Sequence, residues 1–281
     1  MKKLILSLSL VLVSAQLLFS QSGHEQLMHT TYQIAGMGSD NKPRTGTVFF
    51  TGVPSQSDST TYYHVMITAA HVLDSIITPT ATLYFRDTAN DDKLFPYVFQ
   101  IRNGLEPIYT KHPEVDVAAM YMRIPIKTEV INIGISDFAT NDFMTKFEIH
   151  PGDQLFCLGY PLGLSSNQYG YPILRSGFLA SYPLTPMEEF KTFYFDFEVF
   201  PGNSGGPVYI ADKNRIYGGT MHMGQLFGIL GLVTSSIDLK EKISASFIEF
   251  QHIQPLMLAN IINSSYILET ISMLPPKVEN K

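Results

Sequence analysis

An internal disulfide is excluded by the composition, because the 281-residue chain contains a single cysteine. That residue, Cys157, lies in the apolar run 154–158, which is typical of a buried strand. The fold must therefore be held by its hydrophobic core rather than by cross-links. A chain of this length with 45% hydrophobic residues is long enough to bury such a core.

Clustered positive charge is missing as well. Without Lys2 and Lys3, which belong to the leader described below, 17 basic residues stand against 25 acidic ones, a net charge of −8. A phosphate backbone attracts clusters of lysine and arginine, so nucleic acid is not an expected partner. Histidine, cysteine and carboxylate side chains do not recur at metal-ligand spacing either, and we expect neither a metal nor another cofactor.

The first 20 residues have the features of a secretory signal peptide: Lys2 and Lys3, then an uncharged apolar stretch from Leu4 to Phe19. A transmembrane anchor is the alternative, but the stretch is short for a span and is interrupted by serines. We therefore expect export without a stable membrane anchor, to the periplasm or the extracellular space and from a bacterium. The position of the cleavage site and the oligomeric state stay open.

Short β-branched and aromatic runs separated by turns predict an all-β protein of two antiparallel six-stranded barrels. We expect an N-terminal barrel over 28–135 and a C-terminal barrel over 136–247. Between 248 and 274 the apolar residues recur at intervals of three and four, which predicts a C-terminal helix, with helix and tail over 248–281. The runs expected as strands are 31–35, 45–53, 62–68, 81–86, 94–101, 115–122, 154–160, 172–182, 190–197, 206–210, 215–219 and 226–235.

Three short segments carry a possible catalytic apparatus. In 200–207 (FPGNSGGP), Ser204 lies among glycines, which let a backbone expose a nucleophile and direct amides to one point. A serine hydroxyl needs a base, and the base needs a partner that fixes its tautomer. His71 ends the apolar run 67–71 (ITAAH), and Asp116 opens 116–120 (DVAAM). These residues predict a Ser204–His71–Asp116 triad.

A rival interpretation starts from the same glycines, because 202–206 also satisfies the G-x-S-x-G nucleophile elbow of α/β-hydrolases. That elbow requires a helix after the serine, and then Asp and His further along the chain. Here Gly206 and Pro207 follow, then a run typical of a strand. The later Asp238 and His252 lie in polar and amphipathic segments, so the context contradicts the elbow.

The segments ITAAH, DVAAM and FPGNSGGP, in this order, resemble those of the trypsin-like (chymotrypsin-fold) serine peptidases, and most closely their bacterial HtrA-like branch, here without a PDZ domain. The stretches 159–163 (GYPLG) and 175–181 (RSGFLAS) extend the resemblance. It implies a chymotrypsin-like fold, a peptide or protein substrate, and an oxyanion hole from the amides of Gly202 and Ser204. Asn203 replaces the aspartate of animal trypsins, which implies activity without N-terminal cleavage.

The resemblance leaves substrate preference open. The residue six before the serine lies near the floor of the family's primary pocket and is here Glu198, which would attract a basic side chain if it were buried there. Pointing to solvent or pairing within its own barrel is the alternative. Thr234 lies on the strand expected to pair with the substrate backbone. An inactive binding or scaffold protein on the same fold stays the alternative to a secreted serine endopeptidase.

Overall fold

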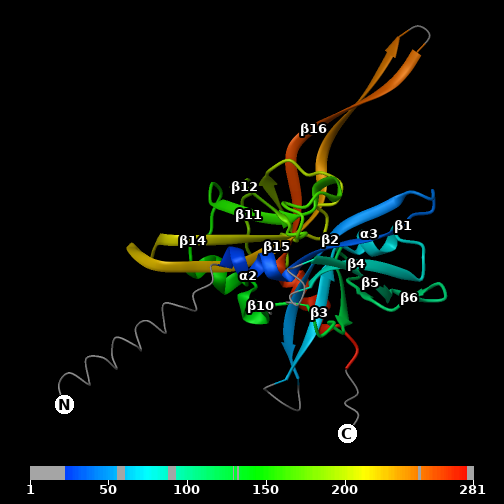
Figure 1. The fold of residues 1–281 in the computed structure, drawn as a ribbon. Coiled ribbons are helices and arrows are strands. Elements are labelled where there is room, and N and C mark those ends of the chain that lie inside the picture. Colours follow the sequence, from blue (N-terminus) through cyan, green and yellow to red (C-terminus); the bar gives the residue numbers. More distant parts are fainter. Residues whose placement is uncertain are drawn as a thin grey trace, which may run out of the picture.

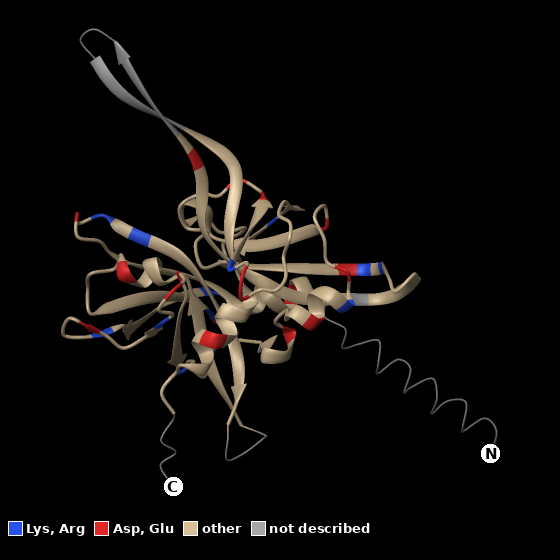
Figure 2. Cartoon of the chain, turned by 180° about the vertical axis from the view of Figure 1, so that it is seen from behind, with Lys and Arg blue, Asp and Glu red and all other residues tan. Residues whose placement is uncertain are grey.

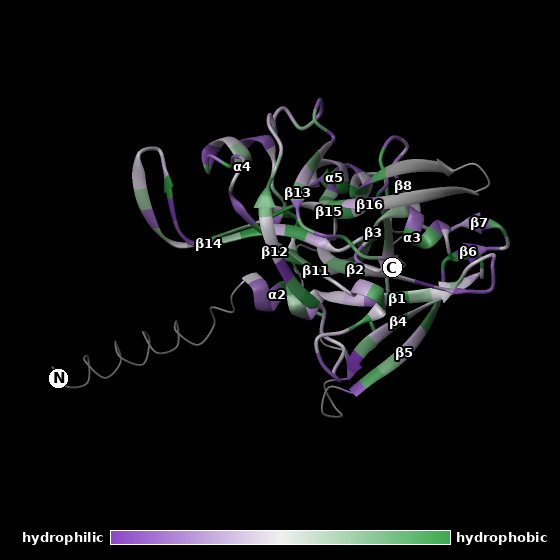
Figure 3. Cartoon of the chain, turned by 90° about the horizontal axis from the view of Figure 1, so that it is seen from above, coloured by the Kyte–Doolittle hydropathy of each residue, from purple (hydrophilic) through white to green (hydrophobic). Residues whose placement is uncertain are grey.

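The computed structural model describes residues 23–55, 61–87, 93–128, 130–131, 133–245 and 248–276. The expected signal peptide lies outside this range. Two β-rich halves lie side by side: seen from above, strands β11, β12 and β14 lie to one side and strands β4 and β5 to the other (Figure 3). Acidic and basic residues are interspersed over both halves (Figure 2).

The N-terminal half is an eight-stranded sheet preceded by helix α2 (Gly23–Thr30). Its strands are hydrogen-bonded in the order β5-β4-β1-β2-β3-β9-β8, and β10 adds a parallel pair to β2. Helix α3 (Ala70–Asp74) follows β3 directly, and β6 and β7 form a separate small hairpin. The strands are β1 (Thr31–Met37), β2 (Pro43–Pro54), β3 (Tyr62–Thr68), β4 (Thr80–Asp87), β5 (Lys93–Gln100), β6 (Arg102–Asn103), β7 (Glu106–Pro107), β8 (Thr110–Lys111), β9 (Ala118–Met122) and β10 (Ile133–Gly134).

The C-terminal half is a closed six-stranded antiparallel barrel in the order β11-β12-β13-β16-β15-β14. The short helices η1 (Ile135–Asp137) and α4 (Asn141–Lys146) connect the two halves, η2 (Pro161–Gly163) follows β11, and α5 (Ser264–Ser272) comes last. The expected all-β, chymotrypsin-like fold is thus confirmed, but the expected six-stranded N-terminal barrel is not: that half is an eight-stranded sheet, because the short strands β8 and β10 add to the six strands that the sequence predicted. The barrel strands are β11 (Gln154–Gly159), β12 (Ile173–Leu179), β13 (Thr192–Asp196), β14 (Pro207–Tyr217), β15 (Thr220–Ala245) and β16 (Ile248–Asn263).

The C-terminal helix is much shorter than the sequence pattern predicts. Residues 248–263 form strand β16, and α5 begins only at Ser264. Pro255 lies inside the segment expected to be helical and would break a helix there. Asn263 marks the true start, because its side chain accepts a hydrogen bond from the Ser265 amide (3.1 Å) as an N-cap. The prediction of a helix from 248 was wrong, because pairing with β15 overrides the local pattern.

This correction also changes the origin of the sixth barrel strand. The two expected strands 206–210 and 215–219 are one strand, β14, and β16 supplies the sixth. Beyond the barrel, β15 and β16 remain paired from Ile237↔Leu258 out to Ala245↔Ile248. The pair forms the long hairpin that projects from the body of the molecule in Figure 1.

Two clusters of buried apolar side chains stabilise the fold. One fills the C-terminal barrel, and it includes Cys157, whose burial raises the pKa of its thiol to about 12. The other fills the N-terminal sheet and continues across the junction to Tyr209 on β14 and Ile267 on α5. The two halves therefore share a core, which fixes the junction where the site lies. Among the described residues, no helix is both long and apolar enough to cross a bilayer.

Candidate active site

His71 and Asp116 are brought together by the N-terminal sheet. His71 is the second residue of α3, immediately beyond the buried end of β3, and Asp116 lies two residues before β9 begins. Strands β3 and β9 are paired, with Thr68 opposite Ala118. The two segments therefore emerge next to each other at one edge of the sheet, as the sequence pattern predicted.

The contact between these two side chains is close and doubly anchored. His71 Nδ1 lies 2.5 Å from Asp116 Oδ2, and the His71 main-chain amide donates to Asp116 Oδ1 at 2.8 Å. Burial raises the pKa of the Asp116 carboxyl, but the hydrogen bonds and charge of His71 outweigh it and leave the pKa below its ordinary value. The carboxylate therefore stays ionised, holds the imidazole ring and leaves Nε2 free for a proton.

Ser204 comes from the C-terminal half, in the turn before β14. Its main-chain oxygen accepts from the Thr47 amide (2.9 Å), and the next amide, Gly205, donates to Val233 O (2.8 Å). The turn is thereby fixed between β2 and β15. A Cβ on Gly205, which has φ +85°, would approach both Thr47 O and Thr68 Oγ1 to 2.2 Å. Only glycine permits this approach to the strand that leads to His71.

The Ser204 hydroxyl donates to Thr234 O at 3.2 Å. Among the described residues it has no hydrogen bond with His71. Without substrate, catalytic hydrogen bonds are often long or misaligned, and they tighten in the substrate complex. Thr234 and His71 line the same cleft of about 530 Å³, together with Asp116, Glu114, Val115, Lys191, Thr192, Ser235, Asn260 and Ile262.

The amides expected to form an oxyanion hole are those of Gly202 and Ser204. Neither N–H donates a hydrogen bond within the part of the chain that the structure describes. Pro201 O accepts from the Leu162 amide at 2.6 Å, and a trans peptide directs its N–H away from its C=O. The Gly202 N–H therefore points away from Leu162. Gly202 has φ +101°, and a Cβ there would lie 2.1 Å from Tyr160 O.

The two residues proposed for specificity lie in different surroundings. Thr234 lines the cleft. It follows Leu232, which is the last residue of β15 that pairs with β14. Glu198 is not among the residues that line the cleft, and its main-chain oxygen accepts from Arg175 Nη1 at 2.7 Å. Arg175 in turn lies over the ring of Phe197, 4.5 Å from its centroid.

Three further residues that shape the site had no clear signal in the sequence. Thr47 Oγ1 donates to Gly202 O (2.7 Å), and the Leu162 amide orients the neighbouring peptide. Leu162 has φ +54°, a backbone conformation that a leucine in the sequence does not predict. His112 accepts hydrogen bonds from the amides of Glu114 and Val115, just before Asp116, and only these contacts distinguish it from an ordinary buried histidine. Among the described residues, no group of acidic, histidine or cysteine side chains could hold a metal.

Two β-rich halves that share a core, one of them a closed six-stranded antiparallel barrel, together with the His71–Asp116 pair, are features of the chymotrypsin-fold class. The model of the trypsin-like peptidase domain family matches residues 50–218, more than half of the chain. The chain belongs to this family. No curated protein matches it in sequence.

Comparison with solved structures supports the fold in one case, that of the protease Anisep, and gives a weaker similarity in a second. The protease Anisep from Arthrobacter nicotinovorans superposes with a TM-score of 0.50 at 12% identity, over 89% of this chain and 96% of that one. A thermostable serine protease, AL20, from an extremophilic microorganism gives a TM-score of 0.47 at 10% identity, over 86% and 95%.

Proposed function

We propose that the protein is an exported serine endopeptidase that uses Ser204, His71 and Asp116. The observation that carries the proposal is the His71–Asp116 pair at 2.5 Å, in a cleft shared with the Thr234 strand to which the Ser204 hydroxyl bonds. Membership of the trypsin-like peptidase family supports a peptide or protein substrate.

In the proposed reaction, a peptide lies along the edge of β15 beyond Val233, whose carbonyl and amide already bond to the Gly205 amide and to Gly206 O. Ser204 Oγ leaves Thr234 O, attacks the carbonyl carbon and gives its proton to His71 Nε2. Asp116 stabilises the imidazolium through Nδ1. The amides of Gly202 and Ser204 stabilise the oxyanion, an effect of roughly 3 kcal/mol for each donor. His71 protonates the leaving amine, and water then hydrolyses the acyl-enzyme by the reverse sequence.

The experiment is labelling with a fluorophosphonate probe, which reacts covalently with an activated serine. We expect the wild type to be labelled and Ser204→Ala to be unlabelled. The matched control is Ser235→Ala, because Ser235 lines the same cleft without a role in the proposed chemistry. Equal labelling of wild type and Ser204→Ala would contradict the assignment of the nucleophile.

An inactive binding or scaffold protein is the second candidate. It is favoured by one observation, the bond from the Ser204 hydroxyl to Thr234 O in place of a bond to His71. If that bond persists with substrate, Ser204 is not activated. Correctly folded wild-type protein that is not labelled, and that binds peptides without cleaving them, would establish this candidate.

A further inference from the structure

The loop that carries Asp116 is held by a second histidine, which the proposed reaction does not use. Residues 112–117 connect β8 to β9, and the His112 amide closes the loop by donating to Val117 O at 3.0 Å. Glu114 in this loop is exposed to solvent, whereas the His112 side chain is only 2% exposed. The His112 ring therefore lies under the loop and not on its surface.

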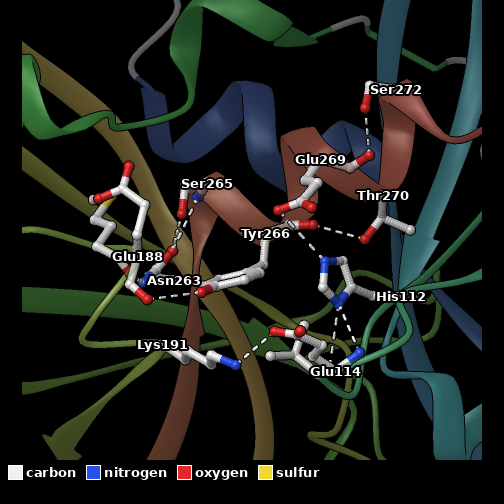
Figure 4. Close-up of polar contacts among 12 residues, drawn as sticks. His112, Glu114, Glu188, Lys191, Asn263, Ser265, Tyr266, Glu269, Thr270 and Ser272 are labelled. Atoms are coloured by element: carbon white, nitrogen blue, oxygen red, sulfur yellow. Dashed lines mark hydrogen bonds and ion pairs between the residues drawn. The ribbon is translucent and has the colours of Figure 1, made fainter.

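The His112 ring supplies the acceptor that the inner side of the loop requires. Its Nδ1 accepts from the amides of Glu114 (3.1 Å) and Val115 (3.2 Å), the two residues that directly precede Asp116 (Figure 4). A ring nitrogen that accepts two hydrogen bonds carries no proton. The ring proton is thus on Nε2, which faces Glu269 Oε2 at 3.5 Å.

Helix α5 holds the other side of the same ring. Tyr266 packs edge-on against His112, with centroids 5.2 Å apart and planes at 88°, and Glu269 lies one turn further along α5 (Figure 4). The Tyr266 hydroxyl donates to Glu188 O at 3.2 Å, in the segment that leads to β13. The C-terminal helix thus links the loop of the N-terminal half to the C-terminal barrel.

We propose that His112 is a positioning residue for Asp116. By binding the amides of Glu114 and Val115, it fixes the backbone from which the Asp116 carboxylate reaches both the amide and the Nδ1 of His71. Without an acceptor, the two amides on the inner side of the loop lose their partner, and the loop rearranges to satisfy them. The effect on turnover rests on the proposed function, whereas the effect on His71 does not.

The test compares two substitutions of His112, one that keeps a hydrogen-bond acceptor at the position of Nδ1 and one that removes it. In His112→Asn, Oδ1 stands at the position of Nδ1 and can accept the same two amides, while the group facing Glu269 is lost. In His112→Leu the apolar bulk stays but the acceptor is lost. We expect His112→Leu to lower kcat at least about 100-fold with KM little changed, because a misplaced catalytic group costs about that much. His112→Asn should keep most of the turnover.

Two measurements separate positioning from folding. Active-site titration with the fluorophosphonate probe normalises kcat to the competent fraction. The ring ¹⁵N chemical shifts of His71, which report its tautomer and hydrogen bonding, need no catalysis. We expect His112→Asn to retain the wild-type shifts and His112→Leu to lose them.

Equal losses of kcat in both variants would overturn the proposal, as would a His112→Leu protein with unchanged His71 shifts and unchanged turnover per active site. If the wild type neither labels nor hydrolyses peptides, the proposed function fails. The ¹⁵N comparison of the two variants still decides whether His112 positions Asp116.

Discussion

The two halves of the molecule hold their parts of the site by different means. In the N-terminal half, side chains bind one another and the loop: Asp116 binds His71, and His112 binds the amides before Asp116. In the C-terminal half, the Ser204 hydroxyl lies in a turn whose features come from the backbone, namely the conformation of Gly202 and two amides without partners among the described residues. The N-terminal part therefore depends on the chemical identity of its side chains, whereas the turn that holds Ser204 depends on allowed backbone angles and close packing.

The largest fall in kcat is expected from replacing a side chain of the N-terminal half. Asp116→Asn keeps the size of the side chain but presents an amide to His71 Nδ1, so that the imidazole is held in the wrong tautomer. We expect kcat to fall by about 10⁴ while the fold persists. Steady-state kinetics with circular dichroism measure both quantities.

The control for this variant is Asp74→Asn, which makes the same chemical change on α3, where Asp74 pairs with Lys111 at 3.1 Å. It should leave kcat near the wild-type value. A similar loss in both variants would mean that the charge of the region, and not the Asp116–His71 contact, determines the rate.

A smaller loss of kcat is expected from restricting the backbone conformation of a glycine in the C-terminal half. In Gly202→Ala, the added Cβ meets Tyr160 O at 2.1 Å and φ +101° becomes strained, so the turn must shift and the Gly202 amide with it. Loss of one oxyanion donor lowers kcat by about 10²–10³. Kinetics normalised to the titrated active fraction measure it.

Gly218→Ala is the matched control, since Gly218 also has positive φ (+58°) but open space around its Cβ position. It replaces another positive-φ glycine away from the site, without a steric clash. Should Gly218→Ala impair kcat as strongly as Gly202→Ala, the loss would come from general destabilisation, and the contrast between the two halves would disappear.

The smallest effect is expected on the unfolding temperature, to which the Asp116 carboxylate of the N-terminal half makes a pH-dependent contribution. Because the folded-state pKa of Asp116 lies below its ordinary value of about 3.9, its contribution is present above that pH and is lost as the pH falls through the folded value. Wild type should therefore unfold at a higher temperature than Asp116→Asn at pH 7, and the difference should shrink towards pH 3. Scanning calorimetry at both pH values measures it. A difference that grew in acid would mean that folding raises the pKa of Asp116 instead of lowering it.

The short strands β8 and β10 were missed, but the other six strands of the N-terminal sheet and the segments that carry His71, Asp116 and Ser204 could be predicted from the sequence. These features are local: β-branched runs make strands, and glycines at 202, 205 and 206 allow the tight turn around the serine. The single cysteine also indicated a fold held by its core, and Cys157 is indeed free and buried.

Features that depend on a partner far along the chain could not be predicted from the sequence. Segment 248–263 has an apolar pattern compatible with a helix, and it becomes a strand because β13 and β15 pair with its two edges. Likewise, no local pattern shows that His112 accepts the amides of Glu114 and Val115 under the cover of α5, or that Leu162 orients the peptide before Gly202. The Leu162–Pro201 bond joins segments far apart in the sequence, and the two bonds to His112 Nδ1, although they lie within one loop, are covered by α5 only when the C-terminal helix packs on the N-terminal half.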